Sequence, residues 1–304
     1  MSNFRLLLHV SHFLKCPYFL KDRERKKAMP ELPEVETVRR SLAKAMEGKP
    51  ISQVSVWRDD LRIPVPQDFS DSVKGLFVHR VGRRAKYLQI FLDKEKVILI
   101  HLGMSGKMLI DIDSNGSNKK LKHEHVTFLI GDRVAIRFVD PRRFGLIDLC
   151  TRDKLSSHPL LVHLGLEPLT EEFSDAYLKK AFKNKKICIK AALLNQHMVA
   201  GLGNIYACEA LWYSCLSPRR NALTITGKRA ERLAQSIKQV LTEAISRGGS
   251  TLRDHVSPDG EMGYFQNSFK VYGRAGAPCF SCNKPVQKMI QLGRSTFFCP
   301  NCQR

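Results

Sequence analysis

A change of hydrophobic period near residue 150 constrains the fold of this chain more than any other feature. Between residues 51 and 149, short apolar or alternating runs recur about eight times, separated by turn residues and without long helical stretches. Further on, the apolar side chains recur at helical spacing, in residues 174–182, 190–196, 205–213 and 226–247. This order predicts an α+β multidomain chain in which an antiparallel β-sandwich precedes a helical domain.

An amphipathic helix is predicted in front of the strands, starting at Pro33. Proline suits the first helical turn, and Glu34 and Glu36 lie at the positive end of the helix dipole. The apolar residues that follow recur at helical spacing, namely Val35, Val38, Leu42 and Met46. We therefore expect this helix to lie against the sandwich.

Helix formation does not require the two residues Pro30 and Glu31. If Met29 is the initiator and is removed, Pro30 carries a free secondary amine. Such an amine can attack a carbon at the aldehyde level and form an iminium, and a neighbouring acid can open a sugar ring. The pair therefore indicates a nucleophile and a general acid, although an arbitrary Pro-Glu in front of a helix would look the same.

Residues 1–28 conflict with this chemistry, because an attached segment would turn the nitrogen of Pro30 into an unreactive tertiary amide. The segment is a poor secretory signal, since charged residues and histidines interrupt its apolar part. An organellar transit peptide is an alternative. The run at 21–27 consists of residues with largely purine codons, as expected of a ribosome-binding site read as protein. We therefore predict that the segment is not translated and that Met29 is the initiator.

The charge of the chain points to a polyanionic partner. Lys and Arg number 50 against 29 Asp and Glu, which gives a formal net charge of +21. An imbalance of this size favours nucleic acid as the partner, ahead of an anionic membrane surface. No apolar run approaches the roughly 18 residues that span a bilayer, so membrane spanning is excluded.

Four of the nine cysteines form two close pairs, Cys279 with Cys282 and Cys299 with Cys302. This spacing is typical of two zinc knuckles that face each other across a hairpin, where four thiolates hold one structural Zn²⁺ and leave no open position. Two disulfides or an iron–sulfur cluster are the alternatives. The other cysteines are scattered singly, which does not fit a disulfide framework and indicates a reducing compartment.

Several blocks of this sequence resemble the formamidopyrimidine-DNA glycosylases, bacterial enzymes that excise oxidised purines and cut the abasic site. The blocks are residues 30–40, His101-Leu-Gly-Met-Ser-Gly, Asp140-Pro-Arg-Arg-Phe-Gly, Gly201-Leu-Gly-Asn-Ile-Tyr and the cysteine-rich tail. The resemblance covers residues 29–304. It implies a removed or misassigned extension at 1–29, a catalytic sandwich domain with its N-terminal helix at 30–152, a linker at 153–168, a helix–two-turn–helix domain at 169–265 and a zinc-finger β-hairpin at 266–304.

The resemblance assigns chemistry to four residues. Pro30 would be the nucleophile and Glu31 the general acid, while Lys86 would hold the sugar and the phosphate of the lesion. Arg294, at the tip of the hairpin, would clamp a phosphate and assist the second elimination. The implied activity is removal of 8-oxoguanine and formamidopyrimidines, followed by β- and δ-elimination at the abasic site. The chemistry needs no cofactor.

Further residues match DNA contacts of that family. His123, Lys186, Lys190 and Asn204 correspond to phosphate contacts. Gly201 and Gly203, next to Asn204, would let the backbone approach a phosphate at the start of a helix.

Three residues on loops match the side chains that fill the gap left by an extruded nucleotide. They are Met104, Arg142 and Phe144. Without the resemblance, Met104 and Phe144 would be interpreted as core. The glycine-rich segment between residues 248 and 265 corresponds to the loop that covers the extruded base.

The resemblance implies a cytoplasmic, nucleoid-associated monomer that acts on damaged double-stranded DNA. Two alternatives stay open. Endonuclease VIII has the same architecture and prefers oxidised pyrimidines, but it typically has a glycine where this chain has Leu32-Pro33. A non-catalytic DNA-binding protein would become the better interpretation if residues 1–28 stayed attached.

Overall fold

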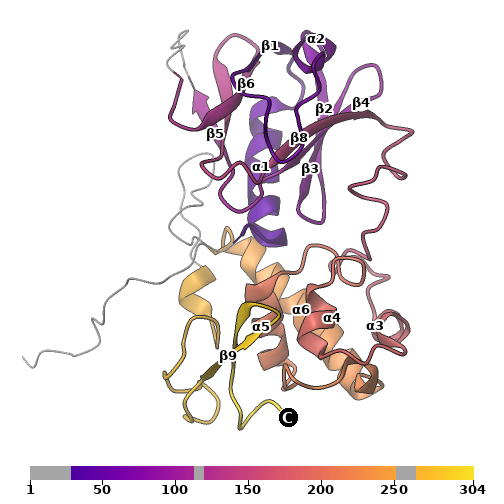
Figure 1. Cartoon of the computed structure of the whole chain (residues 1–304), viewed down its shortest axis with the longest axis vertical. Helices are drawn as coiled ribbons and strands as arrows, with labels where there is room; N and C mark the ends of the chain where they lie inside the picture. The colour runs from indigo at the N-terminus through magenta and orange to yellow at the C-terminus, as the bar shows by residue number, and fades with distance from the viewer. Residues whose placement is uncertain (1–28, 113–119, 251–264) are drawn as a thin grey trace, which may run out of the picture.

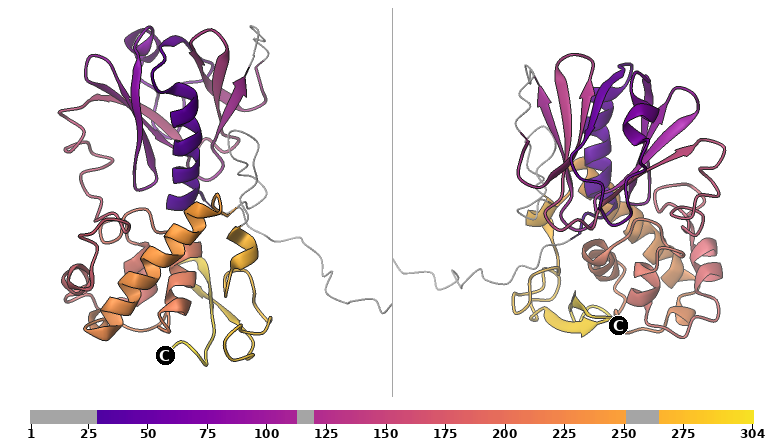
Figure 2. Two further views of the ribbon diagram at one scale, coloured as in Figure 1. Left: turned by 180° about the vertical axis from the view of Figure 1, so that it is seen from behind. Right: turned by 45° about the horizontal axis from the view of Figure 1, so that its top comes forward.

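The helix predicted at the start of the chain is α1, which spans Leu32–Met46 in the computed structural model. The structure describes residues 29–112, 120–250 and 265–304. Pro33 lies in the first turn of α1, and the predicted apolar face is buried along the sandwich. Figures 1 and 2 show α1 running through the N-terminal lobe, with its first turn at the lobe that follows.

The strands of the N-terminal lobe form two antiparallel sheets of four, which confirms the predicted sandwich. One sheet has the order β1-β6-β7-β5, made of Ile51–Val56, Glu124–Ile130, Val134–Val139 and Lys107–Ile112. The other has the order β2-β3-β4-β8, made of Val78–Arg84, Tyr87–Leu92, Lys96–His101 and Leu146–Thr151. One buried cluster joins residues of both sheets to α1, so the helix and the sandwich share a core.

A short helix in this lobe was not predicted. It is α2, which spans Phe69–Val73 and buries Phe69 and Val73 near β1. Phe69 packs edge-on against Phe128 of β6, with the ring centroids 6.0 Å apart. A helix of five residues is too short to show a helical period, so the sequence pattern could not reveal it.

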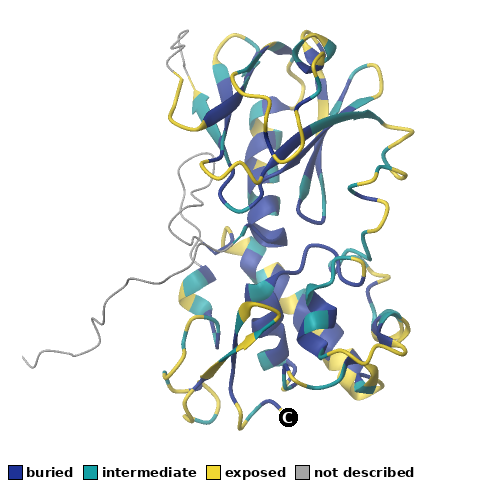
Figure 3. Ribbon diagram, in the orientation of Figure 1, coloured by how far each residue is buried: buried dark blue, intermediate teal, exposed yellow. Residues whose placement is uncertain are grey.

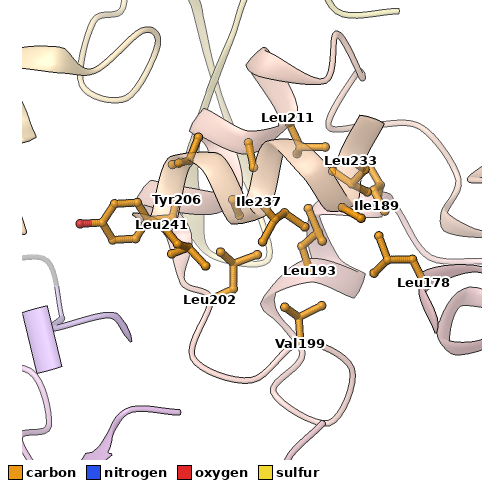
Figure 4. Close-up of a cluster of buried hydrophobic side chains, with 14 of the residues drawn as sticks. Leu178, Ile189, Leu193, Val199, Leu202, Tyr206, Leu211, Leu233, Ile237 and Leu241 are labelled. Carbon is orange, nitrogen blue, oxygen red and sulfur yellow. The ribbon is translucent and has the colours of Figure 1, made fainter. Parts of the chain in front are cut away.

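The predicted helices of the second lobe are present within a few residues of their expected ends. They are α3 (Asp175–Phe182), α4 (Ile189–Leu194), α5 (Asn204–Tyr213) and α6 (Lys228–Ser246), with a 3₁₀ turn, η1, at Ala222–Thr224. Their apolar side chains form a second core, shown in Figure 4. Figure 3 shows that α5 is buried over most of its length, whereas α6 exposes one side.

The first residue of α1 belongs to the core of the second lobe. Leu32 is fully buried in the helical cluster, and its N–H donates to the carbonyl of Gly201 at 3.1 Å. The next apolar residue of the helix, Val35, belongs to the core of the sandwich. The start of α1 therefore joins the two lobes, and Pro30 and Glu31 lie at their junction.

The C-terminal segment forms a hairpin, as predicted. A 3₁₀ turn, η2 (Phe265–Ser268), precedes strands β9 (Gln287–Gln291) and β10 (Arg294–Phe298). Leu292 and Gly293 connect the strands with positive φ at both positions, the geometry that a tight hairpin turn needs. The base of the hairpin packs against α5 through a small cluster that includes Cys208 and Val271. In the described ranges, no helix has the length and apolar character needed to cross a membrane.

Candidate active site and nucleic-acid interface

Glu31 has a buried side chain that reaches from the start of α1 to the start of α5. Only 3% of the residue is exposed. Its carboxylate accepts hydrogen bonds from the backbone N–H groups of Ile205 at 2.9 Å and Tyr206 at 3.4 Å. The first turn of α5 thus supplies N–H groups that have no partner within the helix, and the acid is fixed between the two lobes.

The glycines of the Gly201-Leu-Gly motif fit around the start of the chain. A Cβ on Gly203 would lie 2.2 Å from Cδ of Glu31, and one on Gly201 would lie 2.7 Å from a methyl group of Leu32. Gly201 also has a φ of +79°, which favours glycine. The close backbone approach at these glycines is therefore to Glu31 and Leu32. We expected an approach to a phosphate from the sequence.

Lys86 lies in the turn between β2 and β3 and is buried, with 6% of the residue exposed. Burial lowers the pKa of its ammonium, and the charge of Arg294 acts in the same direction, whereas Glu31 opposes the shift. Burial raises the pKa of Glu31 to about 7, although the nearby Lys86 charge counteracts the increase. The structure therefore brings Glu31 and Lys86 together, and near pH 7 the carboxyl group is able both to hold and to release a proton.

The turn that carries Lys86 is held by an acid from the segment between the lobes. Glu167 accepts hydrogen bonds from the guanidinium of Arg83 at 2.8 Å, that of Arg84 at 3.0 Å, and the N–H of Ala85 at 2.5 Å. Arg84 also donates to two backbone carbonyls of the same segment, at Leu164 and Gly165. The basic cluster before Lys86 is thus a paired network that fixes the turn.

Arg294 is exposed at the start of β10, as expected of a hairpin tip that reaches a ligand. The next residue, Ser295, has a carbonyl that accepts from Nζ of Lys190 at 3.2 Å and from Nδ2 of Asn204 at 2.9 Å. Lys190 also donates to the hydroxyl of Thr296 at 2.6 Å. Two residues with predicted phosphate contacts therefore bind the hairpin that carries Arg294.

The basic residues with predicted phosphate contacts differ in exposure. Lys190 is fully buried, and burial lowers the pKa of its ammonium. Lys186, just before α4, is exposed, and so is His123, which precedes β6 with a positive φ of 65°. Lys186 and His123 are therefore accessible to a ligand in this conformation, whereas Lys190 is enclosed.

The predicted gap-filling residues lie on two neighbouring loops. Met104 is half-buried between β4 and β5, while Arg142 and Phe144 are exposed between β7 and β8. The guanidinium of Arg142 lies 4.7 Å from the centroid of the Phe144 ring. A Cβ on Gly103 would lie 2.4 Å from the backbone of Phe144, so the two loops are in direct contact. Residues separated in sequence by about 40 positions thus form one surface.

The thiols of the four clustered cysteines converge at the base of the hairpin. Their sulfur atoms all lie within 4.8 Å of one another, and the Sγ atoms of Cys282 and Cys299 are 3.5 Å apart. A tetrahedral ion with metal–sulfur bonds of about 2.3 Å requires sulfur atoms roughly 3.8 Å apart, so four thiolates in this arrangement fit one structural metal ion. Trp212 of α5 donates from Nε1 to Sγ of Cys279 at 3.4 Å. The cluster is thereby linked to the helical lobe.

Comparison with known proteins agrees with this geometry. The family model of the formamidopyrimidine-DNA glycosylase N-terminal domain matches residues 29–147, and that of the H2TH domain of the same glycosylases matches residues 164–256. The chain belongs to the formamidopyrimidine-DNA glycosylase family. This glycosylase is 48% identical over 291 residues to the formamidopyrimidine-DNA glycosylase of Bartonella quintana, covering 91% of this chain and all of the relative. The enzyme of Roseobacter denitrificans is 48% identical over 283 residues, with the same coverage.

Solved structures of the family share the fold of this glycosylase. The MutM (Fpg) protein of Thermus thermophilus is 39% identical, with a TM-score of 0.80 over 90% of this chain and 98% of that one. Wild-type Lactococcus lactis Fpg, crystallised with DNA that contains an N7-benzyl-Fapy-dG, is 33% identical, with a TM-score of 0.83 over 90% of this chain and all of that one. The same Lactococcus enzyme has been crystallised with DNA that contains an abasic site. The predicted fold class is confirmed by these matches.

Sequence reasoning missed a second buried acid at the site of this glycosylase. Glu34 accepts from the hydroxyl of Tyr206 at 2.6 Å, from the N–H of Ser250 at 2.8 Å and from the N–H of Glu31 at 2.9 Å. Figure 4 shows the Tyr206 hydroxyl directed out of the helical core. The sequence pattern assigned Glu34 only to the dipole of α1, because its partners in α5 and at Ser250 are distant in sequence. Nothing local in the sequence therefore marked this role of Glu34.

Another missed residue is Tyr272, which follows η2. Burial raises the pKa of its hydroxyl to about 12, and the negative charge of Glu31 adds to the shift. Its backbone N–H donates to Glu209 of α5 at 2.8 Å, as do the N–H groups of Lys270 and Val271 at 2.7 and 3.0 Å. Glu209 therefore anchors the segment that leads into the metal cluster.

Two predictions fall outside the described residues. The segment at 1–28 is one of them. The other is most of the glycine-rich loop expected over the extruded base, since residues 251–264 are not described. Ser250 is the last described residue before that loop, and its hydroxyl donates to Glu34 at 2.7 Å.

Proposed function

We propose that this chain is a bifunctional base-excision-repair enzyme that removes oxidised purines, 8-oxoguanine and formamidopyrimidines, and then cuts the abasic site. The observation that carries the proposal is that Glu31, which directly follows Pro30, and Lys86 are both buried and interact electrostatically at the junction of the two lobes. The membership of the family and the Lactococcus complexes with Fapy-dG and abasic DNA support the choice of substrate.

The first chemical step uses Pro30 as the nucleophile after Met29 has been removed. The match to the family model begins at residue 29, which supports Pro30 as the mature amino terminus. The lone pair of the Pro30 nitrogen forms a bond to C1′ of the damaged nucleotide, and the base leaves with the electron pair of the glycosidic bond and takes up the proton lost from that nitrogen. The nitrogen lone pair then expels O4′ from C1′ and gives the iminium, while Glu31 gives its proton to O4′ as the sugar ring opens. A carboxyl group with a pKa of about 7 holds that proton in about half of the molecules at neutral pH.

The iminium formed at Pro30 makes the C2′ proton acidic, because the cation accepts the electron pair of the broken C–H bond. Loss of that proton expels the 3′ phosphate in the β-elimination, and a second elimination expels the 5′ phosphate and leaves a one-nucleotide gap. Lys86 holds the sugar and the lesion's phosphate, and Arg294 clamps a phosphate during the second elimination. The positive charge of Lys86 also lowers the pKa of an amine beside it, which keeps Pro30 unprotonated near neutral pH.

DNA is held through phosphates and through the gap left by the damaged nucleotide. The exposed His123 and Lys186 contact phosphates, and the surface formed by Met104, Arg142 and Phe144 enters the stack. Asn204 is the remaining phosphate contact, whereas the enclosed Lys190 acts by holding Ser295 of the hairpin that carries Arg294.

The metal at Cys279, Cys282, Cys299 and Cys302 is one Zn²⁺ with a structural role, and the chemistry needs no cofactor. When bound, the ion stabilises the hairpin and leaves no coordination position for substrate. We also propose that the enzyme works as a monomer in the bacterial cytoplasm, at the nucleoid; its bacterial relatives support the compartment, and the DNA in the Lactococcus complex supports the nucleoid.

Borohydride trapping tests the nucleophile with a matched pair of proteins. One starts at Pro30, and the other is the full chain from Met1, verified by intact mass. Incubation with an 8-oxoguanine:C duplex and borohydride should give a covalent protein–DNA adduct with the first protein and none with the second. An adduct of equal yield with the chain that still begins at Met1 would show that another residue attacks the sugar.

A comparison of lesions tests the substrate class. The Pro30-initiated protein should excise 8-oxoguanine opposite C faster than thymine glycol in an otherwise identical duplex. Faster excision of thymine glycol would assign the chain to the pyrimidine-directed activity. Steeply salt-dependent binding without cleavage of either duplex would refute the enzymatic function.

A further inference from the structure

Asp140 is a fully buried acid to which the proposed chemistry gives no role. It lies at the end of β7, and 0% of the residue is exposed. A buried carboxylate is costly unless hydrogen bonds compensate it. Its surroundings therefore indicate what it stabilises.

The carboxylate of Asp140 joins the two loops that carry the gap-filling residues. From the loop of Met104, the Ser105 hydroxyl donates to Oδ1 at 2.5 Å. From the loop of Phe144, the N–H of Arg142 donates to Oδ1 at 3.2 Å and the N–H of Gly145 donates to Oδ2 at 2.8 Å.

The backbone of Asp140 extends the same connection to a fourth predicted DNA contact, His123. Its N–H donates to the carbonyl of His123 at 3.0 Å. Its carbonyl accepts from Nε2 of the buried His125 at 2.7 Å. One residue thus fixes the positions of both loops and of the turn that presents His123.

The chemistry of the donors explains why an acid stands here. Three donors converge on two oxygens, and the Ser105 hydroxyl itself accepts from the N–H of Arg142 at 3.2 Å. An amide at position 140 would place an NH₂ group against the Gly145 N–H on one side or the Ser105 hydroxyl on the other. Either orientation leaves a buried donor without an acceptor.

We propose that Asp140 is a positioning residue for extrusion of the damaged nucleotide, because it holds Met104, Arg142 and Phe144 as one rigid surface. It does not touch the reacting atoms. This inference rests on the proposed function, since it concerns how that activity reaches a base stacked inside a duplex. Extrusion leaves a gap that must be filled at once, so two loops that move separately would lose the surface that fills it.

The expected effect of Asp140→Asn depends on the substrate. Loss of one buried hydrogen bond to a charged group corresponds to a change of roughly ten- to a hundredfold, so excision from an 8-oxoguanine:C duplex should fall by at least about tenfold. Cleavage of a single-stranded oligonucleotide with a preformed abasic site should not change, because no base is extruded and no partner base is left behind. Ser105→Ala, which removes one of the donors, should give a weaker effect with the same substrate dependence.

Glu124→Gln is the matched control. Glu124 is a buried acid of the same sandwich that pairs with Arg137 and, among the described residues, makes no hydrogen bond to either gap-filling loop. Thermal unfolding is recorded for every variant. The control should lose stability without separating the two substrates, whereas Asp140→Asn should separate them.

A direct readout uses 2-aminopurine placed opposite a non-cleavable abasic analogue. Wild-type protein should change the fluorescence on binding, because inserted side chains alter the stacking of the opposite base. Asp140→Asn should bind the same duplex with a much smaller change. Equal loss of activity on both substrates, or a fluorescence change equal to that of the wild type, would overturn the proposal.

The two hypotheses fail in different ways. If the wild-type protein that starts at Pro30 cleaves neither substrate, the proposed enzymatic function is refuted. The fluorescence comparison still decides the role of Asp140, because it needs only DNA binding.

Discussion

Raising the pH above 7 should slow base excision much more than it slows cleavage of a preformed abasic site. Both reactions need the free amine of Pro30 and the same DNA contacts, so these requirements cancel when the two rates are divided. Excision depends on the proton of Glu31, whereas an abasic sugar already exchanges with its open aldehyde form and can react with Pro30 without that proton. The ratio of the rates therefore reports the protonated fraction of that carboxyl group.

The size of the effect follows from the burial of Glu31, which raises its pKa to about 7. About half of the carboxyl groups are protonated at pH 7 and about one in a hundred at pH 9, so the ratio should fall roughly 50-fold between these values. Below about pH 6 it should be flat. A carboxyl group with the ordinary value of 4.5 would already lose about tenfold per unit above pH 5.

Single-turnover rates on denaturing gels, with 8-oxoguanine:C and abasic-site:C duplexes from pH 5 to 9, give this ratio without interference from product release. Glu31→Gln should give a low ratio that does not depend on pH. Glu36→Gln is the control on the same helix. Burial acts against the shift there, but Arg39 and Arg83 hold the pKa of Glu36 below its ordinary value, and the break should stay near 7. A ratio that stays flat from pH 6 to 9 in the wild type would exclude Glu31 as the acid.

Three further results are expected. The change in melting temperature caused by Glu31→Gln should be more favourable at pH 8 than at pH 4. The pKa of Glu31 is about 7 in the folded state and 4.5 in the unfolded state, so protonated Glu31 contributes about 3 kcal/mol to the free energy of unfolding below pH 4.5. This contribution is lost as the pH rises through 7. An equal change in melting temperature at both pH values would contradict this. Lys186→Met should lower the slope of log K against log salt concentration for DNA binding by about one. Lys190→Met should leave this slope unchanged and slow strand cleavage, because Lys190 is buried against the hairpin. Equal slopes for the two variants would place both lysines at the DNA. Displacement of the metal by a mercurial should release one Zn²⁺ per chain and abolish cleavage, since the hairpin with Arg294 has little apolar core of its own; retained cleavage would argue against the structural role.

The architecture was largely predictable because each element has a local signal. The strands of the sandwich and the helices α3 to α6 follow from the period of their apolar residues, and the hairpin follows from the spacing of the cysteines. The only α-helix that escaped prediction among the described residues is α2, which is too short to show a period. The Gly201-Leu-Gly motif was identified from its glycines, but its close neighbours, Glu31 and Leu32, could not be deduced without the fold.

Lys190 shows where local reasoning fails at the site. It follows a run of lysines at 183, 185 and 186, and nothing in the sequence distinguishes it from those neighbours. In the fold it is the second residue of α4, faces the hairpin and is fully buried against Thr296, more than 100 positions away. Burial of a lysine depends on the residues that pack over it, and here those residues are distant in the sequence.

The buried acids have a common reason for escaping prediction. Glu34, Asp140 and Glu209 all accept hydrogen bonds from backbone N–H groups, at Ser250, at Gly145 and at Val271 respectively. Every residue except proline has such a donor, so the partner leaves no mark on the sequence. Glu209 alone has a local signal, because it is the one charged residue of the otherwise apolar helix α5. A charged acid in a helix that is buried on all sides is stable only if it accepts hydrogen bonds there. A scaffolding role for Glu209 is therefore predictable from the sequence of α5 alone, before its partners are known.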